Sequence, residues 1–379
     1  MQADDGTGVP DGPPTLCETG EDHLVSQLLS RLAQSPCPPQ DPCPRGPALL
    51  EVGPGDDAAV LTRTPTGGRL VLSTDTLVQG HDFRPDWSTP EEIGAKTAAQ
   101  SFADVASMGA RPLALLLSLA APGHLGTDWA LRLADGLAQE CRRAGAVVAG
   151  GDVSAASEIV LTGTAVGLLV GPPVLRSGAR VGDVVALAGR TGPSAAGLAL
   201  LAAGAGGSTS EHAEFLAAHR APRPDYSVGP VAAGAGAHAL IDVSDGLLRD
   251  AARIAVASGV RVDLDPEALR PDRAMLRAAG TVLAARQPLV SRQPLAARSL
   301  RDPEVFLTAR EWVLSGGEDH AFLGCFDPSS PLPRPFRPVG RVLALPRGPG
   351  GDTGKDTVAA VTVGGQPWEG SPGWTHFNG

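Results

Sequence analysis

The chain of 379 residues has very little lysine, few aromatic side chains and no long apolar run. Lys96 and Lys355 are its two lysines, and aromatic residues make up 4% of the sequence. Basic residues number 31 against 41 acidic ones, for a net charge of −10. This balance argues against a nucleic-acid partner, because phosphate backbones bind basic surfaces. No stretch of about 18 uninterrupted apolar residues occurs, so we expect no membrane span.

The five cysteines are odd in number and irregularly spaced, so they indicate neither a disulfide framework nor a zinc site. Free thiols are typical of the reducing cytoplasm, which is where we expect the protein to reside. Residues 1–20 are acidic and rich in glycine and proline, and they lack the apolar core of a signal peptide. We interpret this N-terminal segment as disordered.

Strand-like and helix-like patterns alternate along the rest of the chain. Strands are expected at 69–73, 113–119, 146–149, 159–169, 184–188, 238–243 and 321–326, and helices at 90–109, 127–143, 194–203 and 246–258. This interleaving predicts an α/β (α+β) fold with two domains, which we place at residues 21–173 and 174–379. Residues 270–303, rich in arginine, alanine and proline, are expected to form an irregular surface insertion.

Five acidic segments follow apolar runs or glycines, and we interpret them as short turns that gather around one site. They are Gly55–Asp57, Ser73–Asp75, Asp104 within a helix, Gly150–Asp152 and Asp242–Asp245. Carboxylates at strand ends are hard oxygen ligands of the kind that Mg²⁺ prefers. Each segment alone is also ordinary turn chemistry, because aspartate bonds its own backbone. Asp104 lies near a helix C-terminus, where a negative charge is unfavourable unless a cation or solvent is near.

Common glycine-rich phosphate loops are absent from the sequence. A P-loop requires a glycine directly before its lysine and a hydroxyl residue directly after it. Lys96 lacks the glycine and Lys355 lacks the hydroxyl residue, while the Gly189–Gly192 loop falls short of a dinucleotide fingerprint. Two lysines cannot offset the repulsion between two phosphate groups, so metal ions held by the carboxylates are the obvious candidates for that role in any phosphate chemistry.

Taken in order, these motifs resemble those of the thiamine-phosphate kinase family, within the aminoimidazole-ribonucleotide-synthetase-like superfamily. The matching segments are Gly55–Val60, Ser73–Val78, Ala103–Ala110, Gly150–Asp152, Arg176–Ala179, Asp242–Leu247 and Ser315–Asp319. The resemblance implies ATP-dependent conversion of thiamine monophosphate to thiamine diphosphate, by direct in-line phosphoryl transfer assisted by several Mg²⁺ ions. It also implies a homodimer in which the sheets of the N-terminal domains pair, and a C-terminal α/β domain.

The resemblance assigns roles at the matching positions. It implies metal ligands at Asp57, Ser73, Thr74, Asp75, Asp104, Asp152, Asp242 and Asp245. It implies ATP contacts at Gly151, Asp152, Arg176 and Ser244, and contacts with the thiamine substrate at Asp82, Glu318 and Trp374. The family usually has a histidine where this chain has Asp82, so either Asp82 or the neighbouring His81 is expected to face the substrate.

Some of these roles have plainer alternatives. Glu318 could belong to a simple turn, and Trp374 could anchor the tail by packing, although an aromatic face also suits a cationic thiazolium. A phosphate acceptor is mostly ionised at neutral pH, so no strong general base is required and we assign none. The competing functions are another ATP-using enzyme of the superfamily and a non-catalytic nucleotide or thiamine-phosphate binding protein, which the substituted Asp82 favours.

Overall fold

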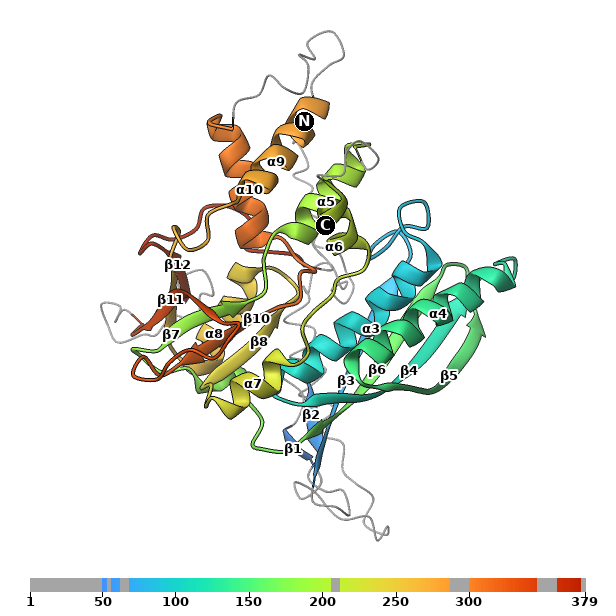
Figure 1. Ribbon diagram of the computed structural model, residues 1–379, viewed down its shortest axis with the longest axis horizontal. Helices are drawn as coiled ribbons and strands as arrows, with labels where there is room; N and C mark the ends of the chain where they lie inside the picture. The colour runs from blue at the N-terminus through green and yellow to red at the C-terminus, as the bar shows by residue number, and fades with distance from the viewer. Residues whose placement is uncertain are drawn as a thin grey trace, which may run out of the picture. The chain divides into compact units, whose positions relative to one another are not determined.

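The computed structural model describes residues 50–52, 56–61, 68–205, 212–286, 300–345 and 360–375. These residues form two six-stranded sheets with helices packed against them, which confirms the expected α/β (α+β) class (Figure 1). The first sheet has the strand order β1-β2-β3-β6-β4-β5, and the second has the order β12-β9-β11-β7-β10-β8. Both sheets belong to the compact unit Pro44–Trp374.

The strands of the two sheets do not mix along the chain. The first sheet contains β1 (Leu50–Val52), β2 (Ala59–Leu61), β3 (Arg69–Val78), β4 (Arg111–Ala121), β5 (Val147–Ala155) and β6 (Val160–Leu169). The second contains β7 (Val184–Ala188), β8 (Ala239–Val243), β9 (Arg261–Leu264), β10 (Ala321–Phe326), β11 (Arg337–Leu343) and β12 (Val361–Val363). The division into two domains at residue 173 stays a prediction.

Helix boundaries follow from local capping chemistry. Thr89 and Glu92 form a reciprocal capping box at the start of the first described helix, and Gly145 ends the next one in a left-handed conformation. The helices are α3 (Pro90–Ser107), α4 (Thr127–Ala144), α5 (Pro193–Ala202), α6 (Ala213–Arg220), α7 (Val228–Gly234), α8 (Leu247–Ser258), α9 (Arg273–Ala285) and α10 (Pro303–Ser315), with a 3₁₀ turn, η2, at Arg176–Gly178.

Helix α3 packs against β3 and β6 of the first sheet and also against β8 of the second. Small residues permit this burial on several sides: a β-carbon at Gly94 would lie 2.1 Å from the backbone oxygen of Leu133 in α4. Phe102 is fully buried in a core that also contains Leu240 and Phe322 of the second sheet. Burying such a side chain contributes about 2–3 kcal/mol. The fold therefore fixes the C-terminal turn of α3, with Asp104, between the two sheets.

Two interpretations from the sequence are wrong. Ser73–Asp75 and Gly150–Asp152, expected as turns, lie inside strands β3 and β5. Residues 273–285, expected to be irregular, form α9, and Met275 of this helix is buried in the core of the second sheet. Alanine and arginine are strong helix formers, so this composition suits a helix. The rest of the expected insertion, residues 287–299, lies outside the described residues.

The first sheet has an exposed edge and one open face. The expected strand at 113–119 is not buried throughout: β4 exposes Leu113 and Leu116, because α3 and α4 cover only one face of the sheet (Figure 1). Strand β5, at the end of the strand order, is exposed along its whole length, and Val153 retains 77% of its accessible surface. By contrast, β8 and β10 of the second sheet are buried at every position.

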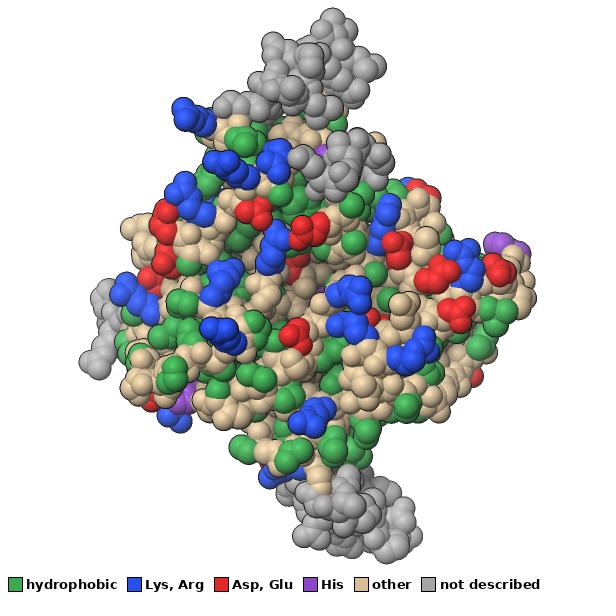
Figure 2. Space-filling view, viewed as in Figure 1, with side chains coloured by type: hydrophobic (Ala, Val, Ile, Leu, Met, Phe, Trp, Pro, Cys, Tyr) green, Lys and Arg blue, Asp and Glu red, His purple; other side chains and the backbone are tan. Residues whose placement is uncertain are grey.

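On the face shown in Figure 2, acidic and basic side chains are interspersed rather than gathered by sign. Cys141 and Cys325 are buried free thiols, whereas Cys17, Cys37 and Cys43 lie outside the described residues, as does the 1–20 segment. Across the described ranges, every helix is too short or too polar to cross a bilayer.

Candidate active site

Three carboxylates meet where the two sheets adjoin. Asp57 lies just before β2, Asp104 lies in the last turn of α3, and Asp242 lies in β8. Each offers one oxygen, and these three oxygens all lie within 4.8 Å of one another. The fold thus brings three of the predicted metal ligands into one cluster, although Asp57 and Asp242 are 185 residues apart in the sequence.

Hydroxyl and imidazole donors surround this cluster. Ser73 Oγ donates a hydrogen bond to Asp104 Oδ2 at 2.5 Å, and Ser107 Oγ donates to Asp57 Oδ2 at 2.7 Å. His320 Nδ1 lies 3.0 Å from Asp242 Oδ2. Burial alone would lower the pKa of His320, but this bond and the charges of Asp242, Glu318 and Asp75 together raise it. The donors partly offset the repulsion between the carboxylates and fix their orientation.

Asp75 joins the cluster from the same face of β3 as Ser73, since alternate residues of a strand share a face. Burial raises the pKa of Asp75, and the nearby charge of Asp242 adds to this effect against hydrogen bonds that lower it. Burial likewise raises the pKa of Asp104 well above its usual range, with further contributions from Asp75 and Asp242. Asp75 Oδ2 is buried and has no hydrogen-bond partner among the described residues.

These observations fit a divalent cation of the Mg²⁺ type. The donors are carboxylate and hydroxyl oxygens, which are hard ligands, and one buried oxygen has no partner. Mutually repelling carboxylates in a poorly solvated place are also the arrangement that a cation would relieve.

Three other predicted metal ligands are placed elsewhere. The side chain of Thr74 lies on the opposite face of β3, where its Oγ1 is 3.1 Å from Thr164 Oγ1. Asp152 is exposed on β5 and accepts a hydrogen bond from Ser154. Asp245 forms an ion pair with Arg253, with Nη2 2.6 Å from its Oδ2. Their metal contacts stay predictions.

The predicted ATP-binding residues Arg176 and Gly151 have clear structural roles. Arg176 reaches the cluster from η2: its Nη2 forms an ion pair with Asp57, and its backbone N–H donates to Asp56 Oδ2 at 3.2 Å. Gly151 is required by the close approach of β4, because a β-carbon there would lie 1.9 Å from the oxygen of Leu117. Arg176 is therefore part of the cluster, whereas Gly151 lies on the exposed edge strand.

Glu318 and Trp374, the two residues of the C-terminal half that were expected to contact thiamine, both hydrogen-bond to the backbone of the Asp242–Asp245 segment. Glu318 N–H donates to the oxygen of Ser244 at 2.6 Å, and Trp374 N–H donates to the oxygen of Asp245 at 2.9 Å. The Trp374 side chain keeps 47% of its surface exposed, so its ring face is available for stacking. The structure thus gathers Ser244, Glu318 and Trp374 beside Asp242.

The Glu318 carboxylate is held by two nitrogen groups from different helices. Lys96 Nζ of α3 lies 2.6 Å from its Oε1, and His219 Nδ1 of α6 lies 3.2 Å from its Oε2. Burial alone would raise the pKa of Glu318, but these two groups outweigh it and lower the pKa to about 2. Glu318 is therefore ionised at neutral pH.

Asp82 uses its carboxylate within its own turn. Its Oδ2 accepts a hydrogen bond from the backbone N–H of Val78 at 2.7 Å, and its carbonyl accepts one from Lys96 Nζ at 2.8 Å. His81 beside it is exposed. The choice between Asp82 and His81 as a substrate contact stays open to experiment.

Sequence reasoning missed three residues of the site: Lys96, His219 and His320. The rarity of lysine was a signal for Lys96, and His320 directly follows the Ser315–Asp319 motif. Nothing in its local sequence marks His219.

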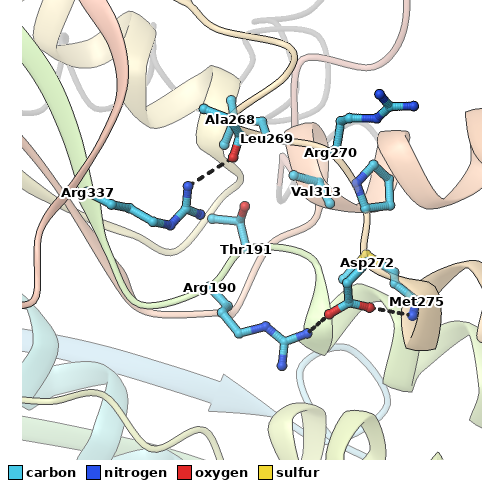
Figure 3. A pocket seen from close by; sticks show the side chains of 10 residues that line it. Arg190, Thr191, Ala268, Leu269, Arg270, Asp272, Met275, Val313 and Arg337 are labelled. Atoms are coloured by element: carbon cyan, nitrogen blue, oxygen red, sulfur yellow. Dashed lines mark hydrogen bonds and ion pairs between the residues drawn. The ribbon is translucent and has the colours of Figure 1, made fainter.

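A small pocket of about 70 Å³ lies apart from these residues, in the second sheet's half of the unit (Figure 3). Arg190, Thr191 and Arg337 line it together with residues 268–272. Arg337 Nη1 donates to the oxygen of Ala268 at 3.0 Å, and Arg190 pairs with Asp272 at 2.7 Å, as the dashed lines show. Pockets for drug-sized ligands are typically about 300–1,000 Å³, so this one is too small for a nucleotide.

Comparisons with known proteins agree with this architecture. Residues 55–169 match the family model of the AIR synthase related protein, N-terminal domain. The structure of AaThiL complexed with AMPPCP and TMP is similar, with a TM-score of 0.75 and 25% sequence identity over 96% of this chain and 99% of that chain. The fold and its carboxylate cluster define an AIR synthase related protein.

Curated relatives narrow this class. Thiamine-monophosphate kinase of Mycobacterium tuberculosis (strain H37Rv, ATCC 25618) is 41% identical over 365 residues, which cover 96% of this chain and 93% of that protein. Thiamine-monophosphate kinase of Corynebacterium glutamicum is 40% identical over 291 residues, covering 76% and 80%. The chain belongs to the thiamine-monophosphate kinase family and is an enzyme of the kinase class, which confirms the resemblance seen in its motifs.

Proposed function

We propose that the protein transfers the γ-phosphoryl group of ATP to thiamine monophosphate, giving thiamine diphosphate and ADP. An oxygen of the acceptor phosphate forms the new bond to the γ-phosphorus, in line with the bond to the β–γ bridging oxygen, which breaks. The observation that carries the proposal is the cluster of Asp57, Asp104 and Asp242, in a chain whose relatives bear the name of this kinase. The AaThiL complex with AMPPCP and TMP supports the two substrates.

Several Mg²⁺ ions are the proposed cofactors, with Asp57, Asp75, Asp104 and Asp242 as the central ligands and Ser73 beside them. When bound, the ions supply charge neutralisation and orientation for the phosphate groups. Thr74, Asp152 and Asp245 complete the proposed ligand set. The hydroxyl of Thr74 faces Thr164 on the other side of β3, so Thr74 could bind a metal ion on the Ser73 side only through its backbone.

The protein's own side chains bind and orient the two substrates. Arg176 presents a planar guanidinium beside Asp57, suited to the ATP phosphates, and Gly151, Asp152 and Ser244 complete the proposed ATP contacts. Glu318 and Trp374, both fixed by the backbone of the Ser244–Asp245 turn, are the proposed thiamine contacts, together with Asp82. A phosphate acceptor that is already ionised needs no proton removed, so no general base enters the scheme.

A homodimer is the proposed assembly, formed through the exposed part of the first sheet. Strand β5 exposes Val147, Val148 and Val153 as well as Asp152, and isolated edges of this kind are normally covered or charged. Pairing there would bury apolar surface and enclose Asp152. The cytoplasm, which supplies ATP and a reducing environment for free thiols, is the proposed location.

Purified protein incubated with MgATP and thiamine monophosphate tests the function directly. Thiamine diphosphate and ADP should form in equal amounts, measured by chromatography. ATP binding without either product across a range of Mg²⁺ concentrations would favour a non-catalytic binding protein instead. ADP formation that requires a different phosphate acceptor would favour another enzyme of the same superfamily.

A further inference from the structure

We propose that Lys96 is a positioning residue for the thiamine side of the site, because its buried ammonium ties the Glu318 carboxylate to the Asp82 turn. This inference rests on the proposed function, since it concerns how the thiamine substrate is held. Lys96 does not contact the transferred phosphoryl group in the scheme above. Its action is exerted through Glu318 and through the turn that follows β3.

The geometry of Lys96 is that of a link between two distant segments. The side chain leaves α3 and is almost fully buried, with 1% of the residue's surface exposed. Its Nζ lies 2.6 Å from Glu318 Oε1 and 2.8 Å from the carbonyl oxygen of Asp82. Asp82 follows a strand of the first sheet and Glu318 precedes a strand of the second. One ammonium group therefore fixes the distance between two segments that are both expected to face the substrate.

The Glu318 backbone needs such support. Glu318 has a φ of +63°, in the left-handed region that side chains other than glycine rarely adopt. A backbone conformation of this kind is strained and persists only where the surroundings hold it. The bond from its N–H to Ser244 holds the main chain, and Lys96 and His219 hold the two carboxylate oxygens.

The charged groups around Glu318 explain why Lys96 matters more than His219. Lys96 faces it from α3 and His219 from α6, while Asp319 and His320 follow it along the chain. His219 is shared, because its Nδ1 also lies 3.2 Å from Ser194 Oγ. Lys96 is thus the strongest permanent cation beside the carboxylate and the group that keeps it ionised.

An arginine would not replace this lysine, although the chain uses arginine for most of its other basic positions. The ammonium is a compact point charge whose donors reach two acceptors in different directions. A guanidinium is planar and larger, and at a site with 1% exposure it has no room without displacing the Asp82 turn. This constraint accounts for a lysine, and not an arginine, at this buried position in a lysine-poor chain.

Steady-state kinetics of Lys96→Met, Lys96→Arg and wild-type enzyme test the inference. Lys96→Met should raise the KM for thiamine monophosphate by roughly tenfold or more, since hydrogen bonds to charged groups are the strong ones. The KM for ATP should stay within roughly twofold, because Arg176 and the carboxylate cluster are untouched. Lys96→Arg should not restore the wild-type KM. Circular dichroism and thermal melting report whether each variant is folded.

A matched control and a double-mutant cycle separate positioning from general stability. Arg132→Met removes a surface cation of α4 whose Nε lies 2.6 Å from Oε1 of Glu91 on α3. This variant should leave both KM values unchanged. In a Glu318→Gln background, Lys96→Met should raise the KM for thiamine monophosphate less than it does in the wild-type background, because only the link to the Asp82 turn remains to be lost. Lys96→Gln, which removes the charge but keeps an amide NH₂ donor group, is the second variant if Lys96→Met does not fold.

The outcomes are distinguishable. If the wild-type enzyme forms no thiamine diphosphate, the proposed function fails and the inference fails with it. If wild type is active but Lys96→Met changes both KM values equally, or changes only the melting temperature, the positioning role alone is overturned.

Discussion

The junction between the two sheets and the outer edge of the first sheet both carry predicted metal ligands, yet they differ in almost every physical respect. At the junction, Asp57, Asp104 and Asp242 lie within 4.8 Å of one another, and burial raises the pKa of Asp104. At the edge, Asp152 is exposed on β5 with Ser154 as its hydrogen-bond donor. The junction therefore gathers several carboxylates within one chain, whereas the edge presents a single exposed carboxylate.

This difference shows that the energetic cost of an aspartate depends on its surroundings within one protein. Carboxylates at the junction destabilise one another until a cation binds, because they are close and poorly solvated. The carboxylate at the edge is solvated and costs nothing by itself. At the junction, a substitution that removes a charge should therefore raise the stability of the metal-free protein and lower its activity. At the edge, the same kind of substitution should have little effect on the stability of the monomer.

Asp104→Asn is the substitution with the largest expected effect. It removes one of the clustered negative charges while keeping the side-chain shape, so the metal-free protein should melt at a higher temperature than wild type. Addition of Mg²⁺ should raise the melting temperature of wild type and raise that of the variant much less. Formation of thiamine diphosphate should fall by roughly a thousandfold or more, as expected when a group that holds transition-state charge is lost.

Asp152→Asn is the matched control at the edge. Without Mg²⁺, its melting temperature should equal that of wild type, because the carboxylate is exposed and does not face the cluster. If Asp104→Asn lowers the metal-free melting temperature, or if both variants respond equally to Mg²⁺, the contrast between junction and edge does not hold.

The elements that carry the junction could largely be predicted from the sequence. Thr89, Pro90 and Glu92 mark the start of α3, and Gly145 marks the end of α4, because capping signals act over a few residues. Strand β7 has the bounds expected from its apolar run. The segment Ser73–Asp75 was misinterpreted as a turn because aspartate is depleted in strands. In the structure Thr74 lies on the open face of the sheet, whereas Ser73 and Asp75 face Asp104 of α3.

Contacts across long stretches of the chain could not be predicted in the same way. Lys96 and Glu318 are 222 residues apart, and their ion pair depends on how α3 lies against the second sheet. The motifs indicated that Asp57 and Asp242 belong to one site, but the ion pair between Asp57 and Arg176, 119 residues apart, depends on packing. Helix α9 was missed because its apolar positions are mainly alanine, which gives a weak periodic signal.

The ion pair between Glu318 and the buried Lys96 gives the second test, through its pH dependence. The folded-state pKa is lowered from 4.5 to about 2, so the unfolded chain binds more protons between these values. The stabilisation is therefore fully present above about pH 5 and is lost as the pH falls toward 2. The shift corresponds to at most about 3 kcal/mol. Glu318→Gln should lower the free energy of unfolding by about this amount at pH 7, measured by denaturant titration.

Glu91→Gln supplies the control for that measurement. Glu91 pairs with Arg132 at the same N···O distance of 2.6 Å, but at the surface, where solvent screens the interaction. Its loss should change stability little at any pH. The gap between Glu318→Gln and wild type should narrow between about pH 5 and about pH 3, as Glu318 becomes protonated in the unfolded wild-type chain. A gap that widens on acidification would contradict the assignment of an ionised Glu318.

Val153→Asp tests the edge itself and has the smallest expected effect per chain. Val153 is 77% exposed, so the substitution should leave the folded monomer intact and act on its pairing with a second copy. Loss of one buried valine costs about 1.5 kcal/mol, which weakens dimerisation by roughly tenfold for each copy, and a charge at the edge adds repulsion. Sedimentation velocity should show a shift toward monomer, whereas Val181→Asp, at a valine 61% exposed outside both sheets, should not. If wild type and both variants are all dimers, the exposed edge does not form the interface, and Asp152 does not face a second copy of the chain.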